Sequence, residues 1–196
     1  MSSKDDQECP DKKEHILNVT LDLLKTEGFE GITVRKIAKE AGVNVALINY
    51  YFGTKDKLLN SAVQKLISSF KETFSILDDN EKESREKLKK FLLGYIEICK
   101  QYPFIVKRLV VEDPFLFDSQ KEFLEFIKAI GLRSLLRTVG EITGETDQEK
   151  LTIMTSHILG ASFLPLLMEP LYMKITGFPF PDAETRIDIL LEQYFE

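Results

Sequence analysis

Residues 33 to 57 read TVRKIAKEAGVNVALINYYFGTKDK, and this stretch decides the fold. It carries five basic and two acidic residues, a local charge of +3, in a chain whose formal net charge is −6. Two short segments with helical periodicity flank AGVN, in which Gly42 can adopt the left-handed conformation that turns the chain sharply. Thr33 and Asn44 precede the two segments as favourable N-caps. The stretch therefore predicts a helix-turn-helix.

The second helix of this pair has the surface expected of an element that enters a major groove of DNA. The small side chains of Val45 and Ala46 can approach base edges, and the amides of Asn44 and Asn49 can pair with bases. The hydroxyls of Tyr50 and Tyr51 can reach phosphates. Thr33 and Lys55 begin flanking helices, whose positive ends attract phosphate. Arg35 is a further candidate phosphate contact. Tyr50 and Tyr51 could instead be structural, and that alternative stays open.

The order T-V-R-K-I-A-K-E-A-G-V-N-x-x-x-I-x-Y-Y-F-G-T-K-D-K-L-L resembles the DNA-binding signature of the TetR family of one-component transcription regulators. The resemblance is dense from Ile16 to Leu59. It implies that three N-terminal helices bind DNA, that a long fourth helix joins them to a ligand-binding body, and that the last two helices form a homodimer. It assigns phosphate contacts to Thr33, Tyr51 and Lys55, and the exposed recognition-helix positions to Asn44, Val45, Ala46, Leu47, Asn49 and Tyr50.

Two residues depart from the pattern of the family that the chain resembles. Asn49 stands where a tyrosine is common, and Val45 stands where a lysine or another polar residue is common. Both positions belong to the helix expected to read bases. The operator sequence therefore cannot be taken over from a relative.

Composition excludes several other classes of protein. With 43% apolar residues in 196, the chain can bury a core and is not disordered overall. Its cysteines, Cys9 and Cys99, stand far apart, and it has two histidines, so no disulfide framework, metal site or cofactor is expected. The polar N-terminus predicts no signal peptide and hence a cytoplasmic protein. Phosphate-binding glycine loops and nucleophile motifs are missing, which argues against an enzyme, although a histidine–carboxylate pair stays open.

Helical periodicity is nearly continuous and predicts an all-α chain of about nine helices. The expected domains are a DNA-binding domain at 1–54 and an effector-binding and dimerisation domain at 55–196. The expected helices run from about 11 to 27, after Thr33, after Asn44, from 55 to 78, up to Tyr102, from 104 to 112, from 119 to 144, from 146 with a kink at Pro165 or Pro170, and after Asp182.

Residues 151 to 168, LTIMTSHILGASFLPLLM, carry no formal charge and reach the length of a candidate transmembrane helix. Hydroxyl side chains and His157 interrupt the run and Pro165 follows, so a helix buried in protein is expected rather than a membrane contact. The last helix also has an apolar face that it cannot cover by itself. Two helices from each of two chains would form a four-helix bundle, and a homodimer is expected.

The body of the chain is rich in aromatic residues, as an apolar cavity for a small molecule requires. The candidate cavity residues are Phe70, Phe74, Tyr95, Cys99, Phe126, His157 and Ser162. Cys99 could instead be a core residue, and His157 a core or interface residue. No Arg or Lys clearly points inward, so the effector is expected to be hydrophobic or mildly polar.

The pattern as a whole favours a ligand-responsive regulator, a repressor released from palindromic double-stranded DNA by a small molecule. The open alternative is a DNA-binding regulator that is constitutive or controlled by a protein partner.

Overall fold

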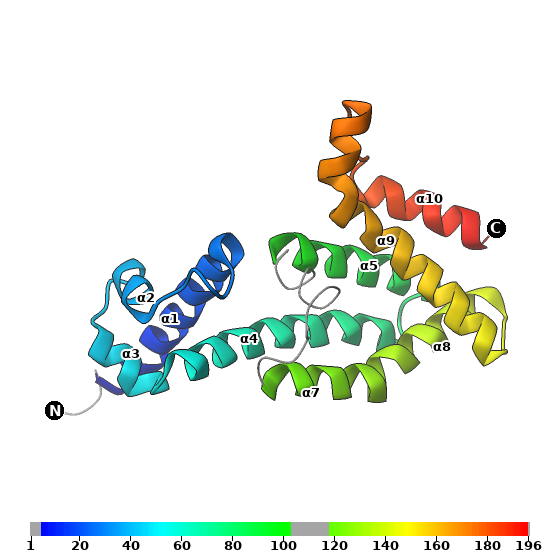
Figure 1. Cartoon of the computed structure of the whole chain (residues 1–196). Coiled ribbons are helices and arrows are strands. Elements are labelled where there is room, and N and C mark those ends of the chain that lie inside the picture. The colour runs from blue at the N-terminus through cyan, green and yellow to red at the C-terminus, as the bar shows by residue number, and fades with distance from the viewer. Residues whose placement is uncertain (1–4, 103–117, 196) are drawn as a thin grey trace. The chain divides into compact units, whose positions relative to one another are not determined.

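The structure is a computed structural model that describes residues 5–102 and 118–195, and the regular elements within the described residues are all helical, as predicted. The helix expected at 104–112 lies outside the described residues. The elements in chain order are α1 (Asp5–Glu27), α2 (Val34–Glu40), α3 (Val45–Phe52), α4 (Lys55–Ser75), the 3-10 turn η1 (Ile76–Asp78), α5 (Ser84–Gln101), α7 (Asp118–Phe126), the π-helical turn η2 (Ile127–Gly131), α8 (Leu132–Thr143), α9 (Gln148–Thr176) and α10 (Ala183–Phe195) (Figure 1).

The described chain divides into two compact units. The first runs to Ser68 and includes Tyr102 and α7 as far as Phe123, and the second comprises Ser69–Gln101 and the chain from Leu124 onward. The division falls inside α4, whereas the sequence-based boundary after residue 54 was drawn by function. That functional boundary stays a prediction.

Side-chain caps set the helix starts in the first unit. The Thr33 Oγ1 accepts a hydrogen bond from the Lys36 amide at 3.2 Å, and the Thr54 Oγ1 accepts one from the Lys57 amide at 3.2 Å. These caps satisfy amides that have no partner inside the helix. Helix α1 differs from expectation because it begins at Asp5 rather than near residue 11.

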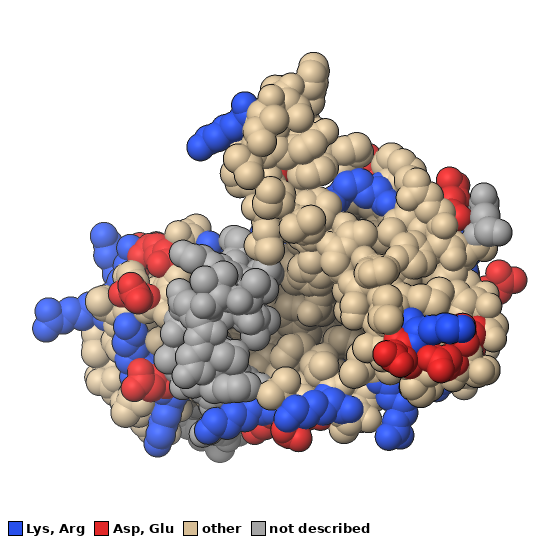
Figure 2. All heavy atoms as spheres, turned by 45° about the vertical axis from the view of Figure 1, so that its right-hand side comes forward, with Lys and Arg blue, Asp and Glu red and all other residues tan. Residues whose placement is uncertain are grey.

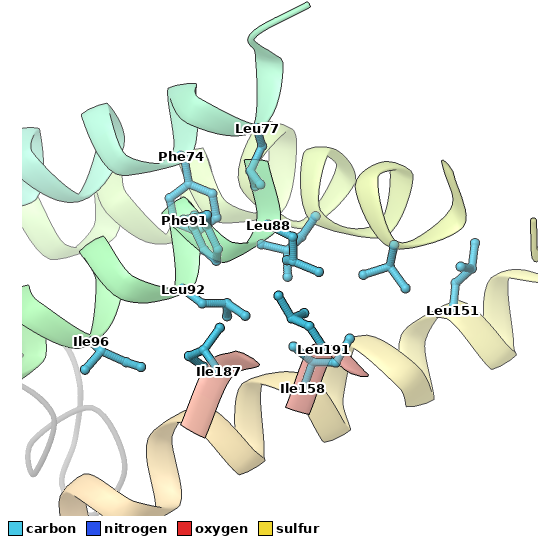
Figure 3. Close-up of a cluster of buried hydrophobic side chains, with 12 residues drawn as sticks. Phe74, Leu77, Leu88, Phe91, Leu92, Ile96, Leu151, Ile158, Ile187 and Leu191 are labelled. Atoms are coloured by element: carbon cyan, nitrogen blue, oxygen red, sulfur yellow. The ribbon is translucent and has the colours of Figure 1, made fainter. Parts of the chain in front are cut away.

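The second unit is built around one apolar core to which five helices and η1 contribute (Figure 3). Phe74 and Leu77 come from the end of α4 and from η1, and α5 contributes the largest share. The remaining members come from α8, α9 and α10; the complete set is Phe74, Leu77, Leu88, Phe91, Leu92, Ile96, Leu135, Val139, Leu151, Ile158, Ile187 and Leu191. Burial of this apolar surface is the main term that stabilises the unit.

Helix α9 is only partly covered within its own unit. Its buried residues, Leu151, Thr155, Ile158 and Ser162, all lie in its first half. The exposed apolar residues lie mostly in the second half, and they are Ile153, Leu164, Leu167, Met168, Leu171, Met173 and Ile175. The helix bends along its length, as expected from Pro165 and Pro170, and its far end is largely uncharged (Figures 1 and 2).

The expectation that residues 151 to 168 are buried is therefore not met by the described chain alone. The reason is that the other helices of the unit contact the first half of α9 and leave the second half in solvent. By length and composition α9 is the one described helix that could cross a membrane, but core helices of water-soluble proteins pass the same test.

A π-helical turn joins α7 to α8, so that residues 118–143 form one continuous helical segment, as the sequence predicted. Gly131 ends this turn, and a Cβ atom placed there would lie 3.0 Å from Cε1 of Phe74 and 3.1 Å from Cδ1 of Ile127. The absence of a side chain at Gly131 therefore permits the close approach of η2 to Phe74. At Gly160 on α9, in contrast, a Cβ atom would have no neighbour within 4 Å.

These two helical glycines form a matched pair for a stability test. Gly131→Ala should lower the free energy of unfolding by about 1–3 kcal/mol, because the added methyl overpacks the core against Phe74. Gly160→Ala should raise it by up to about 1 kcal/mol, because alanine has the higher helix propensity and meets open space. Urea unfolding followed by circular dichroism measures both. Equal effects of the two substitutions would contradict the tight packing assigned to Gly131.

Candidate nucleic-acid interface and apolar pocket

The turn between α2 and α3 is closed by backbone hydrogen bonds and one glycine. Gly42 has a φ of +64°, a value that residues with a Cβ atom rarely adopt. The Ala41 amide donates to the Ile37 carbonyl at 2.9 Å, and the Val43 amide donates to the Ala38 carbonyl at 2.9 Å. These bonds end α2 and reverse the chain within the residues AGVN. The predicted turn of the helix-turn-helix is present.

Helix α3 is held to the first unit by two side chains. Ile48 is 1% exposed and Phe52 is 6% exposed, and both lie on the inner face of the helix. The Lys13 ammonium lies 5.8 Å from the centroid of the Phe52 ring, within the range of a cation–π interaction. Gly53, with a φ of +75°, ends the helix and donates its amide to the Asn49 carbonyl at 2.8 Å.

The opposite face of α3 carries the residues predicted to read DNA. Tyr50 is 77% exposed and its ring meets the Tyr51 ring edge-on, with 5.3 Å between centroids. Tyr51 and Leu47 are half-buried, and the remaining exposed candidates are Asn44, Val45, Ala46 and Asn49. All of these residues lie on or next to one eight-residue helix, so the structure brings them together, and their contact with bases or phosphates stays a prediction.

The caps limit what two of these candidates can offer to DNA. The Asn44 Oδ1 accepts the Leu47 amide at 2.7 Å, which commits its oxygen to the start of α3. The amide nitrogen of Asn44 is not part of that bond and can serve as a donor. In the same way the Thr33 oxygen accepts from Lys36, while its hydroxyl hydrogen can donate to a phosphate oxygen. Each cap therefore leaves a donor, which suits an anionic partner.

The basic residues around the turn differ in their surroundings. Lys36 forms an ion pair with Glu27 at 2.5 Å, so its charge is compensated within the first unit. Arg35 and Lys39 are exposed on α2, and Lys55 is half-buried in the first turn of α4. A modest set of cations, rather than a broad basic face, accompanies α3.

Two sets of contacts that the sequence did not reveal fasten α1 to the turn and to α4. The His15 ring Nε2 lies 3.2 Å from the Ala41 carbonyl oxygen, at the turn itself. The Lys65 ammonium donates to the Glu14 carboxylate and to the Asn18 side-chain oxygen, both at 2.7 Å, and its hydrogen bond lowers the pKa of Glu14. The partners are 26 to 51 residues apart, so no local pattern could have identified them.

The second unit contains an apolar pocket of about 360 Å³. Its walls come from α4, α5, η2, α8 and α9, and the residues that line it are Phe74, Phe91, Tyr95, Ile127, Gly131, Leu132, Leu135, Leu159, Gly160 and Phe163. Phe74 and Tyr95 were among the predicted cavity residues. Phe70 and Phe126 lie behind them, with ring centroids 5.2 Å from Tyr95 and 5.6 Å from Phe74 respectively.

The other three predicted cavity residues lie elsewhere in the second unit. Cys99 is buried on α5, and burial raises the pKa of its thiol to about 12, so it is a neutral packing group at physiological pH. Ser162 is buried and donates to the Ile158 carbonyl of its own helix at 2.7 Å. His157 is exposed on α9, with its ring 6.4 Å from that of Tyr194. None of the three lines the pocket in this structure, and their role in ligand binding stays untested.

A wider surface depression of about 710 Å³ lies along α8 and the turn into α9. Charges of both signs line it, from Arg133 and Arg137 to Glu141 and Glu145. Arg137 pairs with Asp78 at 2.5 Å within the same unit. This depression is a solvated ionic surface, which distinguishes it from the apolar pocket.

Comparison with known proteins agrees with this geometry. Residues 16–62 match the family described as "Bacterial regulatory proteins, tetR family". The chain is 36% identical over 58 residues to HTH-type transcriptional regulator BetI 1 of Chromohalobacter salexigens, covering 30% of this chain and 29% of that relative. It is 27% identical over 164 residues to Probable HTH-type transcriptional regulator YttP of Bacillus subtilis, covering 81% and 76%.

The likeness to the first of these relatives spans less than a third of that protein's length. Over the whole fold, a TetR-like transcriptional regulator from Rhodococcus sp. RHA1 superposes with a TM-score of 0.63 at 16% identity, covering 93% of each chain. The matched segment contains the turn, α3 and the start of α4, and the fold extends the likeness to the rest of the chain. Residues 16–62 therefore form the N-terminal domain of the TetR family of transcriptional regulators, and the chain as a whole has the fold of a TetR-like regulator.

Proposed function

We propose that this chain is a ligand-responsive transcriptional regulator that binds a palindromic operator as a homodimer and is released by a small apolar effector. The observation that carries the proposal is the outer face of α3, where small, amide and aromatic side chains remain in solvent on a helix held by two buried residues. A cytoplasmic location and action as a repressor belong to the same proposal.

DNA binding is supported by two groups of residues, one suited to contact bases and one suited to contact phosphates. Asn49 and the small residues Val45 and Ala46 are exposed on α3 and would meet base edges, where amides and methyl-sized groups discriminate between base pairs. Thr33 and Lys55 lie at helix starts, where phosphates bind without sequence preference. Two copies of α3 would meet successive major-groove faces about 34–36 Å apart or somewhat more.

The homodimer is supported by the exposed apolar side chains of α9. Ile175 is 74% exposed and Leu164 is 58% exposed, although each would gain free energy from burial. Helix α10 adds Ile189, which is 48% exposed, while its Ile187 and Leu191 are used in the core of the unit. A surface of this kind marks an interaction site. A second copy is the partner that a two-fold symmetric operator requires.

Effector control is supported by helix α4, which contributes Lys55 to the candidate interface and Phe74 to the pocket. A ligand that displaces Phe74 moves a helix whose first turn is part of the DNA-binding surface. The ligand shifts the equilibrium only by its differential affinity for the two arrangements, which typically amounts to about 1–3 kcal/mol or roughly 5- to 150-fold in operator affinity. The alternative, a regulator without an effector, predicts operator binding that no small molecule alters.

The operator can be found by sequencing the duplexes that the purified chain retains from a random-sequence pool. Two inverted copies of one half-site are expected. A selected sequence with a single unrepeated site would contradict binding as a symmetric dimer.

Lys55→Ala should weaken binding to every duplex alike and lower the slope of log affinity against log salt by about 1, because one phosphate contact is lost. Asn49→Ala should instead change which half-site is preferred, by about 1–3 kcal/mol at one base pair. Fluorescence anisotropy over a salt series measures both effects. Lys90→Ala is the control, since Lys90 lies on α5 and pairs with Glu86. Equal losses on all duplexes for Lys55→Ala and Asn49→Ala would refute the division into positioning and reading residues.

Ala161→Glu should convert the dimer into a folded monomer. Ala161 is exposed on α9, so the isolated chain tolerates the charge, whereas burial of an unpaired carboxylate between two copies costs about 3 kcal/mol or more. Sedimentation velocity and circular dichroism separate dissociation from unfolding. Ala129→Glu, at an exposed site on η2, is the matched control and should leave the dimer intact. An intact dimer after Ala161→Glu would place the interface elsewhere.

A further inference from the structure

The chemistry of the pocket wall restricts what the pocket can hold. Ten residues line it, and none of them carries a charge. Tyr95 is the only one of the ten with a polar side-chain atom. An ionised ligand would lose its hydration on entry and meet no counter-charge, which is costly in an apolar environment. The pocket wall therefore disfavours carboxylates and ammonium groups alike.

Tyr95 is held in place by neighbouring aromatic rings rather than by its hydroxyl. Its ring stacks on Phe91 at 5.6 Å between centroids with 27° between the planes, and it meets Phe70 and Phe163 edge-on at 5.2 and 4.9 Å. Within the described part of the chain, no hydrogen bond joins the Tyr95 hydroxyl to another protein group, and the hydroxyl is not among the fully buried atoms without a partner, so it keeps some accessible surface. A phenol that is fixed by its ring and has no protein partner at its oxygen is a preorganised hydrogen-bonding group for a ligand.

The protonation state of this hydroxyl agrees with the role of a donor. Burial raises the pKa of Tyr95 well above its ordinary value, so the hydroxyl stays neutral throughout the physiological range. A ligand oxygen could accept its hydrogen, whereas a pure hydrocarbon would leave it unpaired. The pocket thus distinguishes a molecule with one oxygen from both an ion and a hydrocarbon of the same size.

We propose that the effector is a neutral, largely apolar molecule with a single hydrogen-bonding oxygen, and that Tyr95 is the residue that selects and orients it. The proposal rests on the proposed function for the idea that the pocket binds an effector, and it adds the chemical class and the specificity residue. A simple alcohol with a medium-length hydrocarbon chain is the prototype of this class.

The test uses the full-length chain and the hydrocarbon fluorophore diphenylhexatriene, whose emission rises in an apolar site. Decane, decanol, decanoate and decylammonium are compared as competitors at neutral pH, below micelle-forming concentrations. Decanol should displace the fluorophore at concentrations at least roughly 50-fold lower than either ion, because the ions must be desolvated without a partner. Displacement by decanoate or decylammonium as readily as by decanol would overturn the proposed class.

Tyr95→Phe isolates the contribution of the hydroxyl and leaves the ring in place. It should weaken decanol roughly three- to tenfold, the range of one net hydrogen bond, while the affinities of the fluorophore and of decane change little. Tyr172→Phe is the matched control, because Tyr172 stacks on Phe180 and does not line the pocket. Unchanged decanol affinity in Tyr95→Phe would remove Tyr95 as the selecting residue, and no binding of fluorophore or decanol would overturn the whole inference.

The same preparations are assayed for binding to the selected operator duplex. If the wild-type chain binds the duplex but shows no preference for decanol, this inference fails and the DNA-binding part of the proposed function stands. If the wild-type chain retains no duplex, the proposed function itself fails, whatever the fluorophore shows.

Discussion

The burial of Ile48 and Phe52 is the contact on which the candidate DNA-binding surface depends. Helix α3 has eight residues and would not be stable alone, because nucleating a helix costs more than a few hydrogen bonds return. The Asn44 cap and the Gly53 terminus fix its two ends, and the two buried side chains fix its inner face. The exposed side chains of the helix, such as Asn49 and Tyr50, are not needed for this packing and remain available for recognition.

The second unit combines a well-packed apolar core with an apolar pocket. Its core joins the end of α4 to α5, α8, α9 and α10, and Gly131 lets η2 approach Phe74 closely at one wall of the pocket. A π-helical turn is uncommon and often occurs at functional sites. In this chain it supplies Ile127 and Gly131 to the pocket. The aromatic rings around Tyr95 give that wall a fixed shape.

Helix α9 connects the stability of the second unit to the proposed homodimer. Its first half gives Leu151 and Ile158 to the core, while its second half presents apolar side chains to solvent. The two prolines remove backbone hydrogen bonds and bend the helix between these two roles. One helix can therefore stabilise its own unit and still provide an interaction surface.

The helix-turn-helix, the family and the all-α class could be predicted from sequence because their determinants are local. Caps such as Thr33, Asn44 and Asp182 act on amides three residues ahead, and Gly42 acts on its own backbone. The pocket could be predicted only in part, since two of its lining residues, Phe74 and Tyr95, were identified from the sequence. Helical periodicity shows that Cys99 and Tyr95 are buried, but only the packing of α5 against α4, α8 and α9 makes Tyr95 a pocket residue and Cys99 a core residue. The exposure of α9 and the contact of His15 with Ala41 were likewise decided by tertiary structure, because an apolar face or a lone histidine does not encode which distant segment will cover it.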